Sequence, residues 1–99
     1  MPKARGKKRR DDTPEFEVKA RKHFERRWRE RISGTPPNYE VLKDAIRQAA
    51  RGAASPFFTF DRHTPPYSSR WFAQAAGKDI VIAYDHAMKL PVSCWVKGE

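Results

Sequence analysis

One histidine and two arginines recur at intervals of four residues in the first third of the chain: His23, Arg27 and Arg31. On an α-helix this spacing aligns the three side chains along one flank. An imidazole titrates near neutral pH and guanidinium groups match phosphate oxygens, so the set could bind or cleave a phosphodiester. The alternative is a solvated or phosphate-contacting flank without catalysis, and we interpret Lys22, Arg26 and Arg29 as surface charge only.

A second set of polar and aromatic side chains surrounds a proline-rich turn at Thr64-Pro65-Pro66. If the flanking strands pair as a hairpin, Arg62 or His63 comes near Tyr67 and Arg70, and such a groove could hold a phosphate and stack a base. The alternative is that Tyr67 and Trp71 are ordinary core or edge aromatics, that Arg70 pairs with Asp61, and that His63 is a plain surface residue.

The C-terminal strands offer a weaker set. Ser93 could donate a hydrogen bond to a transition-state oxygen, with Tyr84, Asp85 and Trp95 available nearby, although the spacing indicates no acid–His–Ser relay. Cys94 alternates with Ser93 and Trp95, so we expect it to face the core, with Val92 and Val96, and to serve packing.

Positive charge is concentrated at the N-terminus. The 99 residues carry 21 Lys and Arg against 12 Asp and Glu, a formal net charge of +9. Of these, 13 basic and 6 acidic residues lie within residues 1–31. We expect residues 1–11 to form a disordered basic arm that binds phosphates without choosing a sequence. Its six cations are Lys3, Arg5, Lys7, Lys8, Arg9 and Arg10. The same arm could be a localisation signal or a contact for an acidic protein.

Length and composition exclude several classes of protein. A chain of 99 residues supports one small core, and we expect residues 12–99 to form a single domain. The absence of an apolar run argues against a signal peptide or a membrane span, so the expected location is the cytosol. Cys94 is the only cysteine, and His23, His63 and His86 lie far apart in sequence, so we expect no metal site and no cofactor.

Periodicity predicts two helices that position these residues. Asp12 or Thr13 can cap the first helix, with Pro14 in its first turn, and Gly34 ends it. Its apolar stripe recurs every four residues at Phe16, Ala20, Phe24, Trp28 and Ile32. The second helix is expected to begin at the cap Asn38 and to close at Gly52.

The remaining sequence predicts an antiparallel meander. Candidate strands lie around Phe57–Phe60, between Pro56 and Thr64, and at Tyr67–Ala75, Ile80–Tyr84 and Leu90–Val96. The third should be central and covered on one side by helices, whereas Pro91 suits an edge or the beginning of a strand. The expected class is therefore α+β, with two N-terminal helices packed on a three- to four-stranded antiparallel sheet.

These features together resemble small ribonuclease folds of the RelE-like, barnase and colicin D class, and most of all short uncharacterised proteins of phages and mobile elements. The resemblance rests on His23-Phe24-x-x-Arg27-x-x-x-Arg31, on the segment Gly77 to Asp85, and on Pro91-Val92-Ser93. It implies metal-independent RNA cleavage by attack of the ribose 2′-hydroxyl. His23 would be the general acid or base, Arg27, Arg31 and Arg70 would hold the phosphate, and Ser93 would stand where the family often has threonine. The chain departs from the better-known toxins in lacking their strand-borne catalytic residues near the C-terminus.

The sequence thus predicts a small toxin-like protein that binds or cleaves nucleic acid, with RNA favoured over DNA, using Arg31, Arg62 and Tyr67 beside the basic arm. Two alternatives stay open. One is a non-enzymatic DNA-binding protein, and the other is a phage-type protein that inhibits a host enzyme through exposed aromatics such as Trp71, Phe72 and Trp95. An acidic neutralising protein is a further possible partner, and no membrane partner is expected.

Overall fold

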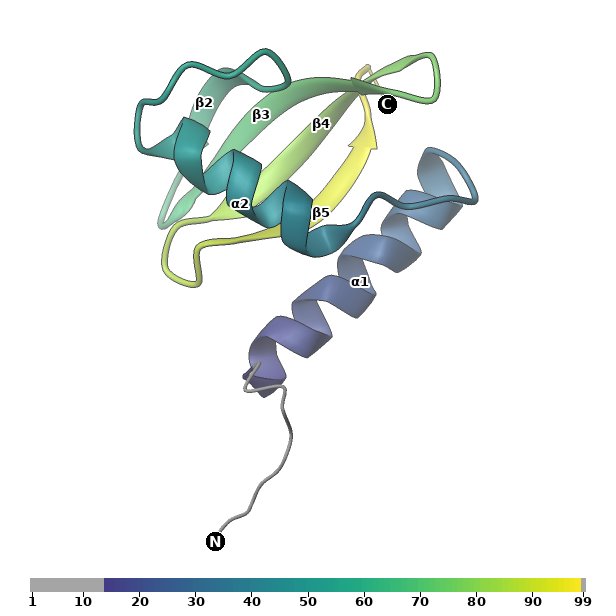
Figure 1. Ribbon diagram of the computed structural model, residues 1–99, viewed down its shortest axis with the longest axis horizontal. Coiled ribbons are helices and arrows are strands. Elements are labelled where there is room, and N and C mark those ends of the chain that lie inside the picture. Colours follow the sequence, from purple (N-terminus) through teal and green to yellow (C-terminus); the bar gives the residue numbers. More distant parts are fainter. Residues whose placement is uncertain (1–13, 99) are drawn as a thin grey trace, which may run out of the picture.

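Two helices precede a four-stranded antiparallel sheet in the computed structural model, which describes residues 14–98 (Figure 1). The elements are α1 (Glu15–Arg31), α2 (Tyr39–Ala50), β2 (Thr59–Thr64), β3 (Ser68–Ala75), β4 (Lys78–Asp85) and β5 (Leu90–Val96). This arrangement confirms the expected α+β class. The predicted basic arm, with its six cations, lies outside the described residues. No helix between residues 14 and 98 has the length and apolar character that a membrane crossing requires.

Helix α1 begins at Glu15, directly after Pro14. Pro14 occupies the N-cap in an extended conformation, without a side-chain cap hydrogen bond among the described residues, and the predicted caps Asp12 and Thr13 lie outside that part of the chain. Phe24 and Trp28 are buried as predicted. Phe16 is 49% exposed, because the first turns of α1 extend past the sheet (Figure 1). The apolar stripe therefore reaches the core from Ala20 onward but not at Phe16.

Helix α2 has the predicted ends. Asn38 Oδ1 accepts a hydrogen bond from the backbone N–H of Val41 at 3.1 Å, which satisfies one free donor of the first turn. Gly52 follows the C-cap with a φ of 96°, a conformation that glycine adopts without strain. The helix is tied to the sheet by Tyr39, whose hydroxyl donates to the carbonyl of Pro91 at 2.6 Å.

The strands form a meander in the order β2-β3-β4-β5. The predicted fourth strand matches β5, and β4 is an inner strand as expected. Ala76 and Gly77 both have positive φ between the paired residues Ala75 and Lys78. Positive φ at both central positions is the geometry of a two-residue hairpin turn that matches strand twist. Pro91 lies near the start of β5, an edge strand, where its missing N–H is tolerated.

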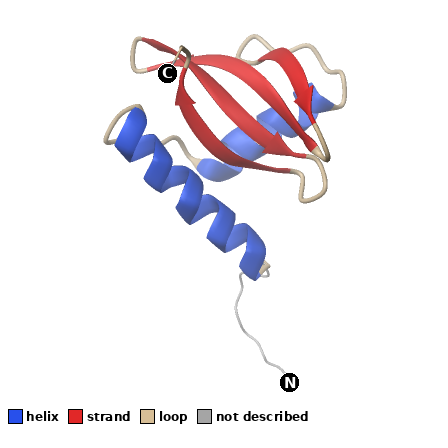
Figure 2. Ribbon diagram, turned by 180° about the vertical axis from the view of Figure 1, so that it is seen from behind, coloured by secondary structure: helices blue, strands red, loops and turns tan. Residues whose placement is uncertain are grey.

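Alternation along the strands gives the sheet two different faces. Helix α2 crosses one face and α1 runs beside β5 (Figures 1 and 2). The covered face holds the core with Phe24 and Ile46 of the helices; its strand residues are Trp71, Ile80, Ile82, Tyr84 and Cys94. Trp71 is 6% exposed, so its interpretation as an exposed aromatic is wrong, whereas the core placement of Cys94 is confirmed.

A buried ion network joins the two helices. The ammonium of Lys43 lies 2.7 Å from Glu17 of α1 and 2.8 Å from Glu40 of α2. The side chain of Lys43 is 9% exposed, so this charge depends on its partners. The network fixes the N-terminal half of α1 against α2.

Candidate nucleic-acid interface

The sheet face opposite α2, called the open face below, carries two aromatic side chains in one row. No helix within residues 14–98 crosses this face (Figure 2). Phe72 on β3 is the register partner of Val81 on β4, and Val81 is in turn the partner of Trp95 on β5. Both aromatic rings are half-buried, while Val81 is 5% exposed between them. The row is therefore an apolar strip across three strands.

A cation lies on each aromatic ring of the open face. The guanidinium carbon of Arg70 is 5.1 Å from the centre of the Trp95 ring. The ammonium of Lys97 is 4.5 Å from the centre of the Phe72 ring. Arg62 on β2 is the register partner of Arg70, so a third cation lies beside the Arg70–Trp95 pair. Rings for stacking and cations for phosphates, side by side, are what a surface for single-stranded nucleic acid requires.

The side chains that were predicted to align on one flank of α1, His23, Arg27 and Arg31, lie near the β5 edge of the sheet. Arg31 donates from Nη1 to the carbonyl of Cys94 at 3.2 Å, one residue from Trp95. Arg27 pairs with Glu30 at 2.9 Å, and His23 Nδ1 is 3.3 Å from the guanidinium of Arg26. Partial burial lowers the pKa of His23, and the charges of its arginine neighbours lower it further. His23 is therefore a neutral imidazole at pH 7 beside several guanidinium groups.

The predicted groove beside the Thr64-Pro65-Pro66 turn is divided between the two faces. Arg62 and Arg70 are partners on the open face, whereas His63 pairs in register with Ser69 on the covered face. Consecutive residues of a strand point to opposite faces, which causes this division, and the irregularity between Phe60 and Arg62 determines that Arg62 takes the open face and His63 the covered face. Tyr67 is 65% exposed in the turn itself.

Other predicted contacts of this set have different partners. Asp61 pairs with its neighbour Arg62 at 3.2 Å and not with Arg70. Arg70 contacts the Trp95 ring, so the structure does not bring it to His23 or Arg27 by any direct contact. Ser93 is half-buried on β5, in the register row of Ala83 and Arg70.

Two histidines that are distant in sequence lie side by side on the covered face. The ring centres of His63 and His86 are 5.9 Å apart. His86 Nε2 is 2.8 Å from Ser69 Oγ, and Ser69 is fully buried. Sequence spacing did not reveal this pair because strand register brings it together. No group of three or more potential metal ligands occurs among residues 14–98.

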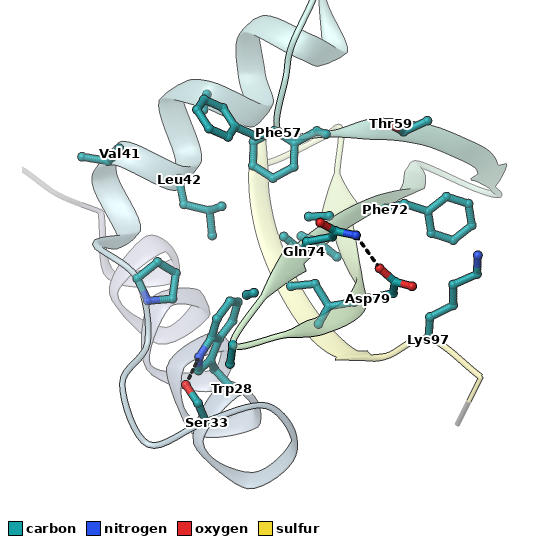
Figure 3. A pocket seen from close by; sticks show the side chains of 18 of the residues that line it. Trp28, Ser33, Val41, Leu42, Phe57, Thr59, Phe72, Gln74, Asp79 and Lys97 are labelled. Atoms are coloured by element: carbon teal, nitrogen blue, oxygen red, sulfur yellow. Dashed lines mark hydrogen bonds between the residues drawn. The ribbon is translucent and has the colours of Figure 1, made fainter.

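An apolar groove separates part of α2 from the sheet (Figure 3). Its volume is about 1130 Å³, and its wall includes Trp28, Leu42, Ala45, Phe58 and Ile80. Val41 and Phe57, also on its wall, are strongly exposed. The polar side chains of Gln74 and Asp79, joined at 2.9 Å, lie at its other end.

Sequence reasoning had missed the joint arrangement of Phe72, Trp95 and Lys97. The sequence signal that could have shown it is the alternation along β3 and β5. Each aromatic follows a core residue in its strand, so its side chain points to the opposite face of the sheet. Comparisons with protein-family models, curated proteins and solved structures find no match to this chain.

Proposed function

We propose that the protein binds single-stranded nucleic acid, RNA in the first place, across the open face of its sheet. The observation that carries the proposal is the row Phe72–Val81–Trp95 with Lys97 and Arg70 over its two rings. Two strand intervals separate the backbone positions of Phe72 and Trp95 by about 10 Å, which leaves room for one base on each ring. Aromatic side chains on a four-stranded sheet are a general platform for stacking unpaired bases.

The cations of the open face would supply the phosphate contacts. When a base takes the place of a cation on a ring, Arg70 or Lys97 can turn to a phosphate oxygen. Arg62, the register partner of Arg70, adds a third cation on β2. Hydroxyls of Ser93 and Thr59 lie in the same register rows as Arg70 and Phe72. Hydroxyl partners for the ribose 2′-OH favour RNA over DNA.

A salt titration of binding tests the proposal. Labelled single-stranded RNA and DNA of one sequence are titrated with the full chain and with a chain lacking residues 1–10. We expect RNA to bind more tightly, with affinity falling steeply with salt. The shortened chain should keep its preference for RNA while its salt dependence becomes weaker, because the arm supplies charge without base contacts.

The opposite result has a clear meaning. If neither RNA nor DNA binds at low salt, the proposal is wrong. The alternative of a protein partner would then be favoured, and the apolar groove beside α2 would be the first surface to examine.

A second candidate function, RNA cleavage, is supported by His23. Its lowered pKa makes it a neutral imidazole that could accept the proton of a ribose 2′-hydroxyl, with Arg31 nearby to hold the phosphate. The test is incubation of RNA with the purified protein in EDTA. Cleavage that disappears in His23→Ala supports this function, whereas intact RNA, or cleavage unchanged in His23→Ala, excludes it.

A further inference from the structure

Buried Ser69 is the centre of a polar network on the covered face. Its hydroxyl oxygen lies 2.8 Å from the indole nitrogen of Trp71 and 2.8 Å from Nε2 of His86. Ser69 has no exposed surface, and Trp71 is 6% exposed. Buried polar groups of this kind must satisfy each other, so the directions of their hydrogen bonds can be worked out.

The network fixes the tautomer of neutral His86. An indole N–H can only donate, so Ser69 Oγ accepts from Trp71 and its own proton is free for Nε2 of His86. Because the described residues offer this buried hydroxyl proton no acceptor other than Nε2, we infer that neutral His86 carries its ring proton on Nδ1. The residues that the structure describes provide no hydrogen-bond partner for that nitrogen.

The ring of His86 is also held in position. Its backbone N–H donates to the carbonyl of Tyr67, and its ring packs edge-on against Tyr84, with centres 5.0 Å apart. The backbone bond places the residue, and the contacts with Ser69 and Tyr84 orient its ring, whose Nδ1–H is left to donate. A donor fixed in this way loses little conformational entropy when it meets an acceptor.

His63 supplies a second imidazole at the same place. Its ring centre is 5.9 Å from that of His86 and 5.0 Å from that of Phe60. His63 follows Arg62 along β2, and its side chain is exposed. Because Arg62 points to the open face, His63 lies just across β2 from it, and His86, which follows β4, reaches His63 past the beginning of β3.

We propose that His86 and His63 form a phosphate-binding site at the β2 edge. His86 donates from Nδ1–H and His63 from a ring N–H to oxygens of one phosphate group. The inference rests on the proposed function, because the phosphate is assigned to an RNA strand that passes from the open face over Arg62. Free phosphate has the same chemistry and is the other possible source. The Ser69–His86 pair is not an activated nucleophile, since Ser69 is inaccessible.

The test is nitrogen-detected NMR of the histidine side chains in the full, ¹⁵N-labelled chain. In the free protein at a pH where His86 is neutral, its nitrogens should show the Nδ1–H form. Inorganic phosphate alone, and separately a short single-stranded RNA, should shift the ring signals of both histidines. RNA affinity should fall about three- to tenfold in His63→Ala and in His86→Phe, the value of one or two lost hydrogen bonds. Lys89→Gln, a matched change of an exposed cation in the same turn, should leave affinity unchanged within about twofold.

Each outcome decides the proposal. An Nε2–H tautomer of free, neutral His86 would overturn it. If RNA binds but neither RNA nor phosphate moves the two histidines, this site is wrong and the proposed function stands. If phosphate moves both histidines and RNA does not bind, the site is one for free phosphate and the proposed function fails. Should His86→Phe not fold, exposed His63→Ala carries the affinity test alone.

Discussion

The guanidinium of Arg70 on β3 reaches diagonally across β4 and stacks on the ring of Trp95 on β5. Lys97 makes the opposite crossing, from the end of β5 to Phe72 on β3. Ala83, the register partner of both Arg70 and Ser93, is small enough to leave room for the Arg70 side chain to cross β4. The two cation–ring pairs together cover Val81, which explains the burial of an apolar residue on a face without a helix.

Each such pair contributes modestly to stability. A cation over an aromatic ring at a partly exposed site stabilises by about 0.5–1 kcal/mol. The pairs therefore order the side chains of the open face without locking them. A base and a phosphate can replace the cation–ring contact at small cost, which is the property that a binding surface needs.

Arg70→Gln tests whether this cation contacts a phosphate when RNA is bound. We expect the slope of log affinity against log salt to become shallower by about 0.7, the value for one phosphate contact on a single strand. Arg51→Gln, which removes an exposed cation at the end of α2, should leave the slope unchanged. Equal slopes in Arg70→Gln and the unaltered chain would show that Arg70 does not contact a phosphate of the bound RNA.

His23 should titrate below the ordinary histidine value of 6.5. Burial is the main cause, and the charges of Arg27, Arg26 and Arg31 add to it. A folded-state pKa below the unfolded value means that stability is fully present above pH 6.5 and declines as the pH falls below it. A proton NMR titration measures the pKa directly. Arg27→Gln should raise it, and a pKa of 6.5 or above in the unaltered chain would contradict the assignment.

Alkali should destabilise the protein in two steps. Burial raises the pKa of the Cys94 thiol from 9.0 to about 12, so stability is lost as the pH rises from 9 toward 12. Burial also raises the pKa of Tyr39 and Tyr84, and this second loss begins above pH 10. Urea unfolding midpoints measured from pH 7 to 11 should fall above pH 9, and Cys94→Ala should remove the decline between pH 9 and 10. A decline in Cys94→Ala as large as in the unaltered chain would contradict this explanation.

Loss of the buried carboxylate beside Lys43 should lower the free energy of unfolding more than loss of the exposed carboxylate. Burial alone would lower the pKa of Lys43, but its hydrogen bonds with Glu17 and Glu40 outweigh burial and raise it. Glu17→Gln takes away the buried partner, and we expect a loss of about 1.5–3 kcal/mol in the free energy of unfolding. The side chain of Glu40 is 60% exposed, so Glu40→Gln should lower the free energy of unfolding by less than about 1 kcal/mol. Urea denaturation of both variants checks the order, and equal losses would show that burial is not the deciding factor.

Local sequence signals predicted the elements well because each depends on near neighbours. The stripe through Phe24 and Trp28, the cap at Asn38 and the apolar alternation of Leu90–Val96 all require only local spacing. They determined which residues enter the core of an α+β fold.

The candidate site was harder to predict because it depends on register and on a single irregularity. Alternation separates Trp71 from Phe72 but does not say which face of the sheet the helices cover. The irregularity beside Asp61 determines that His63 lies on the covered face and Arg62 on the open face, which regular alternation from Phe60 would have reversed. His86 reaches His63 only through pairing of three strands, which no local pattern encodes.

The most direct test of the central claim is the affinity of a double variant, Phe72→Leu with Trp95→Leu, for a short single-stranded RNA. Leucine keeps an apolar residue above Val81, so circular dichroism and urea unfolding should show a folded protein. Stacking of a base on an aromatic ring contributes about 1–3 kcal/mol, so the account predicts a loss of affinity of at least about tenfold. Affinity unchanged within about twofold in the folded double variant would contradict the claim that the open face binds RNA.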